Sequence, residues 1–351
     1  MIRSSRLIPL VVLVGSLLAW SACSKKETLQ FPAGFLFGTA IAGFQVEMGC
    51  PTIAAATCED RHSDWYTFIS DPTLVADTSL HLNGDPPGSG PGFYELYEGD
   101  LDRAQNELKS NTLRLSIEWS RVFPTSTVGV TGYDNLKALA DPTALAYYHA
   151  LFTALKAHNL KPFVTLNHYT LPTWIHDAAG CHRDLAHCSP RGWLDANTPV
   201  EIAKYAGFVA QEFGADVDLW ATLNEPFTAV VLAGYLQPGD ARTNPPAVTL
   251  QWDAAKLAIQ NMIKAHNLMA IAVKAADTVD ADGDGKAARV GLVYNVQATS
   301  PRTNSFVDKQ GARNLSYLMN EMFLDGAING DLDLKLDGTK EHHDELSGNT
   351  D

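Results

Sequence analysis

The sequence predicts an α/β fold, namely a (β/α)8 barrel of which about five βα units are present. Short runs rich in β-branched and aromatic residues alternate with long amphipathic helical patterns, and strands separated by helices pair in parallel. Polar residues follow several of these runs directly, at the edge where barrel enzymes carry their active sites. The alternative is a doubly wound sheet, whose first strand normally leads into a glycine-rich phosphate turn; Gly38 and Gly43 do not fit that turn.

Five strands are predicted, followed by a region without a sixth. The strands are Leu36–Ala40, Thr112–Trp119, Pro162–His168, Leu219–Asn224 and Val290–Asn295. The helical patterns between and after them are Tyr97–Ser110, Thr143–His158, Pro199–Phe213, Ala254–Ala275 and Gly311–Leu324. Their apolar residues recur every three or four positions, which gives each helix one apolar stripe. After Gly330 the chain is rich in Asp, Lys, His and Gly, and we expect no further strand there.

Composition and charge narrow the class of protein. Of the 351 residues, 46% are hydrophobic and 19% are charged, which is typical of a folded globular chain and not of a disordered one. The formal net charge is −14 at pH 7. So acidic a surface repels polyphosphate, and we therefore expect no nucleic-acid partner.

The N-terminal residues have the pattern of an export signal. Arg3 and Arg6 precede an almost wholly apolar stretch that is too short to cross a ~30 Å hydrocarbon core, so residues 1–22 are predicted to be a signal peptide. The small residues before Cys23 resemble a bacterial lipobox, which makes Cys23 a candidate for acylation; ordinary secretion is the alternative. Residues 23–30 are then a short linker and 31–351 the incomplete barrel. We expect a location in the cell envelope, with membrane contact only through a lipid anchor, or secretion.

The cysteines of the exported part fall into two close pairs. Cys50 and Cys58 form one pair, and Cys181 and Cys188 form the other. An even number of closely spaced cysteines in an exported protein predicts two local disulfides, and reduced pairs are the alternative. Neither spacing is typical of a zinc site, so no metal site is predicted there.

Five short segments follow one another in a defined order. They are Phe35–Gly49, Leu113–Arg121, Thr165–Tyr169, Thr222–Pro226 and Phe323–Asp325. In this order they resemble the signature segments of glycoside hydrolase family 1, over most of residues 31–351. The Asn-Glu-Pro of the fourth segment is weak by itself because other families of barrel glycosidases have it, and such a family is an alternative.

The resemblance implies a retaining β-glycosidase, β-glucosidase-like, that hydrolyses terminal β-D-glycosidic bonds of β-glucosides or related oligosaccharides. Such an enzyme uses two carboxyl groups about 5–5.5 Å apart, one as nucleophile and one as acid/base, and needs no cofactor. The motif match makes Glu225 the acid/base. A carboxylate that merely starts a helix is the structural alternative for Glu225.

The same resemblance implies roles for further residues. Asn224 would bind the sugar 2-hydroxyl, Gln45 and His168 would hold other hydroxyls, and Asn295 is another substrate-binding candidate. Arg114 would lie beside the nucleophile and keep it ionised. Each has a structural alternative, such as a turn residue, a capping side chain, a core histidine or an ordinary buried ion pair. Tyr169 and Trp174 either shape the aglycone site or pack.

The family's nucleophile segment contains Glu-Asn-Gly, and this tripeptide does not occur in the sequence. The carboxylates of Glu118, Glu201 and Glu321 do not lie at matching positions and are expected to be solvated at helix or strand ends. We therefore expect the chain to be the N-terminal portion of a longer protein and to be inactive alone. The alternative function is a non-catalytic sugar-binding or surface lipoprotein.

An acidic loop before the fifth strand, Asp280–Gly285, begins like a calcium loop. Gly291 stands where such a loop has its bidentate glutamate, so a solvated acidic turn is the favoured interpretation.

Overall fold

The computed structural model describes residues 30–237 and 243–347. Residues 30–36 belong to a small separate unit with a turn, in which the N–H of Phe35 donates to the carbonyl of Pro32 (3.1 Å). The residues from Phe37 onward form a second unit, which contains all the described strands and helices. Cys23 and the predicted signal peptide lie outside the described residues.

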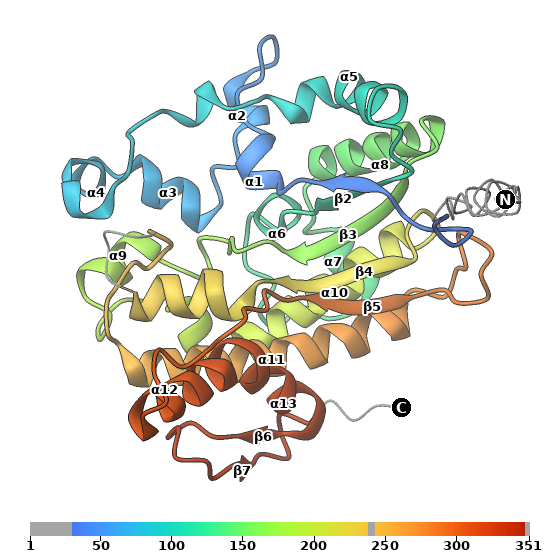
Figure 1. Ribbon diagram of the computed structural model, residues 1–351. Coiled ribbons are helices and arrows are strands. Elements are labelled where there is room, and N and C mark those ends of the chain that lie inside the picture. Colours follow the sequence, from blue (N-terminus) through green and yellow to red (C-terminus); the bar gives the residue numbers. More distant parts are fainter. Residues whose placement is uncertain (1–29, 238–242, 348–351) are drawn as a thin grey trace, which may run out of the picture. The chain divides into compact units, whose positions relative to one another are not determined.

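The second unit is built on a five-stranded sheet in which every neighbouring pair is parallel. The strands lie side by side in chain order, as Figure 1 shows: β1 (Gly38–Ala40), β2 (Thr112–Ser116), β3 (Lys161–Asn167), β4 (Leu219–Asn224) and β5 (Arg289–Val293). The five predicted strands and their parallel pairing are confirmed. The second was predicted too long, because the chain turns after Ser116 and Trp119 begins a short helix.

A helix connects each strand to the next: α5 (Phe93–Asn106), α8 (Pro142–Ala157), α10 (Thr198–Phe213) and α11 (Trp252–Ala276). The start of α8 shows the local cause, since the Asp141 side chain accepts the N–H groups of Thr143 and Ala144 and Pro142 supplies the first helical φ. The predicted helix 311–324 is instead α12 (Phe306–Ser316), η5 (Tyr317–Glu321) and α13 (Met322–Asn329).

Short elements that sequence patterns did not predict fill the loops. They are α1 (Gly43–Val46), α2 (Ala55–Cys58), α3 (Asp64–Ser70), α4 (Pro72–Ala76), η1 (Thr78–Leu80), η2 (Pro87–Ser89), α6 (Trp119–Val122), α7 (Tyr133–Lys137), α9 (Ala178–Arg183), η3 (Gly192–Leu194) and the π-helix η4 (Pro226–Leu236). Most span one or two turns, too few for an apolar stripe to reveal them.

The prediction of no strand after Gly330 was wrong. β6 (Asp331–Leu332) and β7 (Glu341–His342) form an antiparallel hairpin that is separate from the five-stranded sheet. Two-residue strands are too short to show the alternation of apolar and polar residues that identifies a strand. The Leu332 side chain is fully buried in the main hydrophobic core, which stabilises the position of the hairpin.

The core lies between the sheet and its helices and includes Leu113, Leu115, Val164, Trp220 and Leu223 from the strands. Disulfides join Cys50 to Cys58 and Cys181 to Cys188, the two pairs that the spacing predicts. Among the described residues, no helix has the length and apolar character needed to cross a membrane.

Candidate active site

Glu225 directly follows β4 and has an unusual backbone conformation. Its φ is 44°, in the left-handed region that residues with a Cβ seldom occupy. Its N–H donates to the carbonyl of Val293 on β5 (2.8 Å), and its carbonyl accepts the N–H of Ala229 (3.0 Å). The side-chain Oε2 accepts from Thr228 Oγ1 (3.0 Å). Such strained positions cluster at functional sites, where the surrounding structure enforces them.

Glu225 also occupies the N-cap position of η4, as the structural alternative expects. This backbone position therefore fits both an acid/base and a carboxylate that starts a helix. The side chains around Glu225 are what distinguish it from an ordinary helix start.

Asn224, the last residue of β4, joins three strands. Its buried side chain accepts from Arg114 Nη2 through Oδ1 (2.6 Å) and donates from Nδ2 to the Tyr169 hydroxyl (2.7 Å). Arg114 Nε also donates to Thr165 Oγ1 (2.8 Å). Side chains from β2, β3 and β4 thus meet beside Glu225, and Asn224 is held in one orientation.

The surroundings of Arg114 define the electrostatics of this group. Burial lowers the pKa of the Arg114 guanidinium, while the charges of Tyr169 and Glu225 act in the opposite direction. Arg114 therefore lies within electrostatic range of Glu225. The Arg114 guanidinium donates to an amide oxygen and to a hydroxyl, which differs from the ordinary buried ion pair of the structural alternative.

His168 follows β3 and is held as a neutral ring. Burial, and secondarily the charge of Arg114, lower the pKa of His168 to about 3. Its Nδ1 is buried and has no hydrogen-bond partner among the described residues, and its ring meets that of Tyr169 edge-on at 4.7 Å. A neutral imidazole has one donor and one acceptor nitrogen, which suits a hydroxyl ligand.

The remaining predicted residues occupy neighbouring segments. Gln45 is exposed on α1, and Asn295 is half-buried beyond the end of β5. Aromatic rings connect α1 to the turn after β3: Phe44 contacts Trp65 at 6.0 Å, and Trp65 stacks on Tyr169 at 6.1 Å.

The structure separates the two aromatic residues that the sequence left undecided. Tyr169 has a φ of 80° and accepts from Asn224, so it belongs to the candidate site. Trp174 donates to the Phe123 carbonyl (2.9 Å) and packs on Trp119, so it is a packing residue. Trp65 was missed because it lies in none of the recognised segments.

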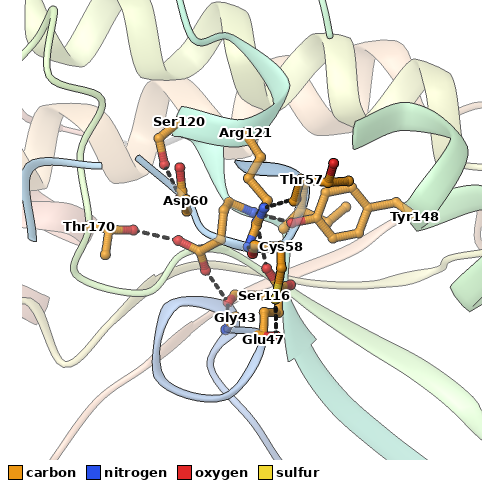
Figure 2. A network of polar contacts seen from close by, with 12 residues as sticks. Gly43, Glu47, Thr57, Cys58, Asp60, Ser116, Ser120, Arg121, Tyr148 and Thr170 are labelled. Atoms are coloured by element: carbon orange, nitrogen blue, oxygen red, sulfur yellow. Dashed lines mark hydrogen bonds and ion pairs between the residues drawn. The ribbon is translucent and has the colours of Figure 1, made fainter. Parts of the chain in front are cut away.

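Two of the three glutamates expected to be solvated are buried, so that expectation was wrong for Glu118 and Glu201. Glu201 accepts from Thr127 Oγ1 (2.7 Å) and pairs with Lys204. Glu118 belongs to a buried network with Glu47, Asp60 and Arg121, and Figure 2 labels these three partners. Burial raises the pKa of Glu118 and Asp60, and that of Glu47 to about 7. Glu321 is exposed, as expected.

The acidic loop is a turn closed by its own backbone. Asp280 accepts the N–H groups of Gly283, Asp284 and Gly285, and Asp284 pairs with Arg289. Asp218, Asp280 and Asp282 come close together, but Asp218 accepts two backbone N–H groups and Asp282 pairs with Lys161. These contacts agree with the interpretation of the loop as an exposed acidic turn.

Comparison with known proteins supports the resemblance. The model of the family "Glycosyl hydrolase family 1" matches residues 27–346. The chain is 36% identical over 332 residues to a beta-galactosidase from Pyrococcus woesei, which covers 88% of this chain and 63% of the relative. It is also 30% identical over 304 residues to a 6-phospho-beta-galactosidase from Lacticaseibacillus casei, and this alignment covers 86% of this chain and 53% of the relative.

Solved structures agree with these relatives. The fold resembles that of Fpglu1 from Fervidobacterium pennivoraus, with a TM-score of 0.75 and 31% identity, covering 85% of this chain and 60% of that one. It also resembles a beta-glucosidase from Pyrococcus furiosus, with a TM-score of 0.71 and 30% identity (82% and 61%). The chain thus spans less than two thirds of these relatives. These structural neighbours imply a (β/α)8 barrel, to which the five parallel strands correspond, and the chain belongs to glycosyl hydrolase family 1.

Proposed function

We propose that the protein is a retaining β-glycosidase that hydrolyses terminal β-D-glycosidic bonds, with Glu225 as acid/base. The observation that carries this proposal is the position of Glu225 directly after β4, beside an Asn224 side chain that Arg114 and Tyr169 hold in place. Carboxyl ends of parallel strands are where barrel enzymes place reacting groups.

In this mechanism a second carboxylate would bond to the anomeric carbon while Glu225 protonates the departing glycosidic oxygen. Glu225 would then remove a proton from the water that displaces this carboxylate. The oriented amide of Asn224 would bind the sugar 2-hydroxyl. The neutral ring of His168, together with Gln45 and Asn295, would bind other hydroxyls. Several of these contacts involve neutral groups, which fits an uncharged sugar.

The names of the relatives support a proposal for the substrate class. They include beta-galactosidases, a beta-glucosidase and 6-phospho-beta-galactosidases. We assign to the protein the chemistry that these names share, which is hydrolysis of a terminal β-D-glucoside or β-D-galactoside.

The proposed mechanism also needs a second carboxylate as nucleophile. Residues 1–351 contain no Glu-Asn-Gly, the tripeptide that would identify it. We infer that polypeptide 1–351 alone does not turn over substrate. Purified 1–351 is expected to release no phenol from an aryl β-glucoside. Robust release that Glu225→Gln abolishes would overturn this inference and assign the nucleophile to a residue within 1–351.

The acid/base assignment is tested on the product of the source gene, sequenced past codon 351. Where this product hydrolyses cellobiose, Glu225→Gln should lower kcat by about 10²–10⁴-fold. The loss should be smaller for an aryl glucoside with an acidic phenol, because that leaving group needs less protonation. Glu201→Gln is the control, a buried glutamate bonded to Thr127 and Lys204. Equal losses on both substrates would contradict the assignment.

Calorimetry of 1–351 with glucose and cellobiose examines the alternative of a sugar-binding lipoprotein. If the source gene ends after codon 351 and the chain binds sugar saturably, the binding function replaces the enzymatic one.

We also propose that the protein is exported and anchored by a lipid on Cys23. The disulfides Cys50–Cys58 and Cys181–Cys188 support export, because such bonds persist in oxidising compartments. Mass spectrometry of the mature protein should find an acylated Cys23 as its first residue, and Cys23→Ser should remove the acyl mass. An unmodified N-terminus elsewhere would contradict the anchor.

A further inference from the structure

A buried polar network is formed by the segments that follow β1, β2 and β3 in the chain, and the proposed sugar-binding residues Gln45 and His168 lie in the same segments. Its ionisable members are Glu47, Asp60, Glu118 and Arg121, each at most 8% exposed. Arg121 Nε donates to Glu47 Oε2 (2.7 Å), and Asp60 Oδ2 accepts from Ser120 Oγ (2.6 Å). Figure 2 labels Glu47, Asp60, Ser120 and Arg121 of this network and marks its hydrogen bonds with dashed lines.

Glu118 connects two of these segments through its two carboxylate oxygens. Oε1 accepts from Ser116 Oγ (2.6 Å), and this hydroxyl oxygen accepts the N–H of Gly43, the first residue of α1 (2.7 Å). Oε2 accepts from Thr170 Oγ1 (2.6 Å) in the turn after β3. α1 carries Gln45, and the turn after β3 carries His168 and Tyr169. One carboxylate therefore holds two parts of the sugar site.

The packing around this carboxylate leaves little room for adjustment. A Cβ added at Gly43 would lie 2.7 Å from Glu118 Oε1 and 2.9 Å from Glu47 Oε1. The backbone N–H of Glu118 itself donates to the Tyr148 hydroxyl (2.9 Å), which fixes the residue from the side of α8. α1 thus rests directly on the glutamates, and its position follows theirs.

We propose that Glu118 is a positioning residue for the sugar site, because it sets the relative placement of Gln45 on α1 and His168 after β3. This inference rests on the proposed function, because it assumes that Gln45 and His168 bind sugar. The effect of Glu118 on the positions of these two residues can be tested without measuring turnover. A buried glutamate that served only stability would leave His168 and sugar affinity unchanged when it is replaced in a chain that still folds.

The experiment uses polypeptide 1–351 with ¹⁵N-labelled histidine and glutamine side chains. Glu118→Ala should shift the imidazole signals of His168 and the amide signals of Gln45. Thr170→Val, a nearly isosteric change, should shift mainly the His168 signals, and Ser116→Ala mainly those of Gln45. Glu201→Ala is the matched control, because Glu201 is also a buried glutamate that accepts from a threonine hydroxyl. It should leave both sets of signals in place.

Calorimetry with D-glucose and cellobiose provides the second measurement. Glu118→Ala should weaken sugar binding by about tenfold, and Glu118→Gln by less, since an amide keeps one acceptor and the same shape. If wild-type 1–351 binds neither sugar, the NMR spectra alone decide the positioning role. If Glu118→Ala does not fold, Thr170→Val and Ser116→Ala decide it. Unchanged His168 and Gln45 signals in those two variants overturn the inference.

Discussion

At the scale of single residues, the buried network places three carboxyl groups around one guanidinium. Burial is the largest cause of the raised pKa of Glu47, and the charge of Arg121 opposes it. The carboxylates of Glu118 and Asp60 add repulsion. Acids with raised pKa values hold protons more tightly in the folded chain than in the unfolded one.

The first prediction concerns the alkaline side of the stability curve. The pKa of Glu47 rises from 4.5 to about 7 on folding. The free energy of unfolding should therefore fall as the pH rises through this range, by up to about 3 kcal/mol for one such group. Urea unfolding at pH 5 and pH 7.5 measures the difference. Glu47→Gln should reduce it, and an unchanged difference in this variant would contradict the raised pKa.

The second prediction concerns the acidic side and has the opposite sign. Burial lowers the pKa of His266 to about 4, and its Nδ1 lies 2.6 Å from Thr222 Oγ1. The unfolded chain then binds the extra proton first, so stability is lost as the pH falls from about 6.5 towards 4. Urea unfolding at pH 6.5 and pH 4.5 should show a smaller loss in His266→Gln than in the wild type. Equal losses would contradict the lowered pKa of His266 in the folded chain.

At the scale of the elements, β1 lies unusually close to β2. Gly38 pairs with Thr112, and a Cβ at position 38 would lie 2.1 Å from the Thr112 carbonyl oxygen. Because this oxygen belongs to the backbone, a side chain there has to move the strand. The close approach explains why glycine occupies this position.

The third prediction uses two glycines of the same sheet. Gly38→Ala should destabilise the chain by about 1–3 kcal/mol, because it forces β1 away from β2. Gly291→Ala in β5 is the control, since nothing lies within 4 Å of its added Cβ. This variant should be neutral or slightly stabilising through the entropy of the unfolded chain. Urea unfolding compares the two, and equal stabilities would contradict the tight β1–β2 contact.

Element boundaries also show how far sequence patterns reach. The crossover helices were predicted to within a few residues, because each buries a long apolar stripe. Two helices next to candidate residues were missed: α1, which carries Gln45, and η4, which follows Glu225. A four-residue helix has no stripe, and η4 is apolar on nearly all sides, so neither has a periodic signal.

At the scale of the whole second unit, the sheet has two outer strands. In the described part of the chain, β5 pairs with β4 on one side and no strand lies on its other side. Unpaired strand edges recruit other strands, which leads to association.

The fourth prediction follows from this edge. Polypeptide 1–351 should associate with increasing concentration in sedimentation velocity, and Gly291→Lys should reduce the association by placing a charge on β5. Gly311→Lys on α12 is the control, since it adds the same charge at an equally open glycine. If both variants associate to the same extent, β5 is not the contact.

The amino-acid sequence alone predicts the alternation of strands and helices, the order of the family segments, the close cysteine pairs and the candidate Glu225. Each of these is a local feature, visible as a period, a motif or a short spacing. Which side chains contact one another is seen only in the folded chain. Asn224 contacts Arg114 and Tyr169, which are 110 and 55 positions away, and the buried carboxylate of Glu118 accepts from Thr170, which is 52 positions away. Contacts between distant segments depend on packing in three dimensions, and a local sequence pattern therefore does not predict them.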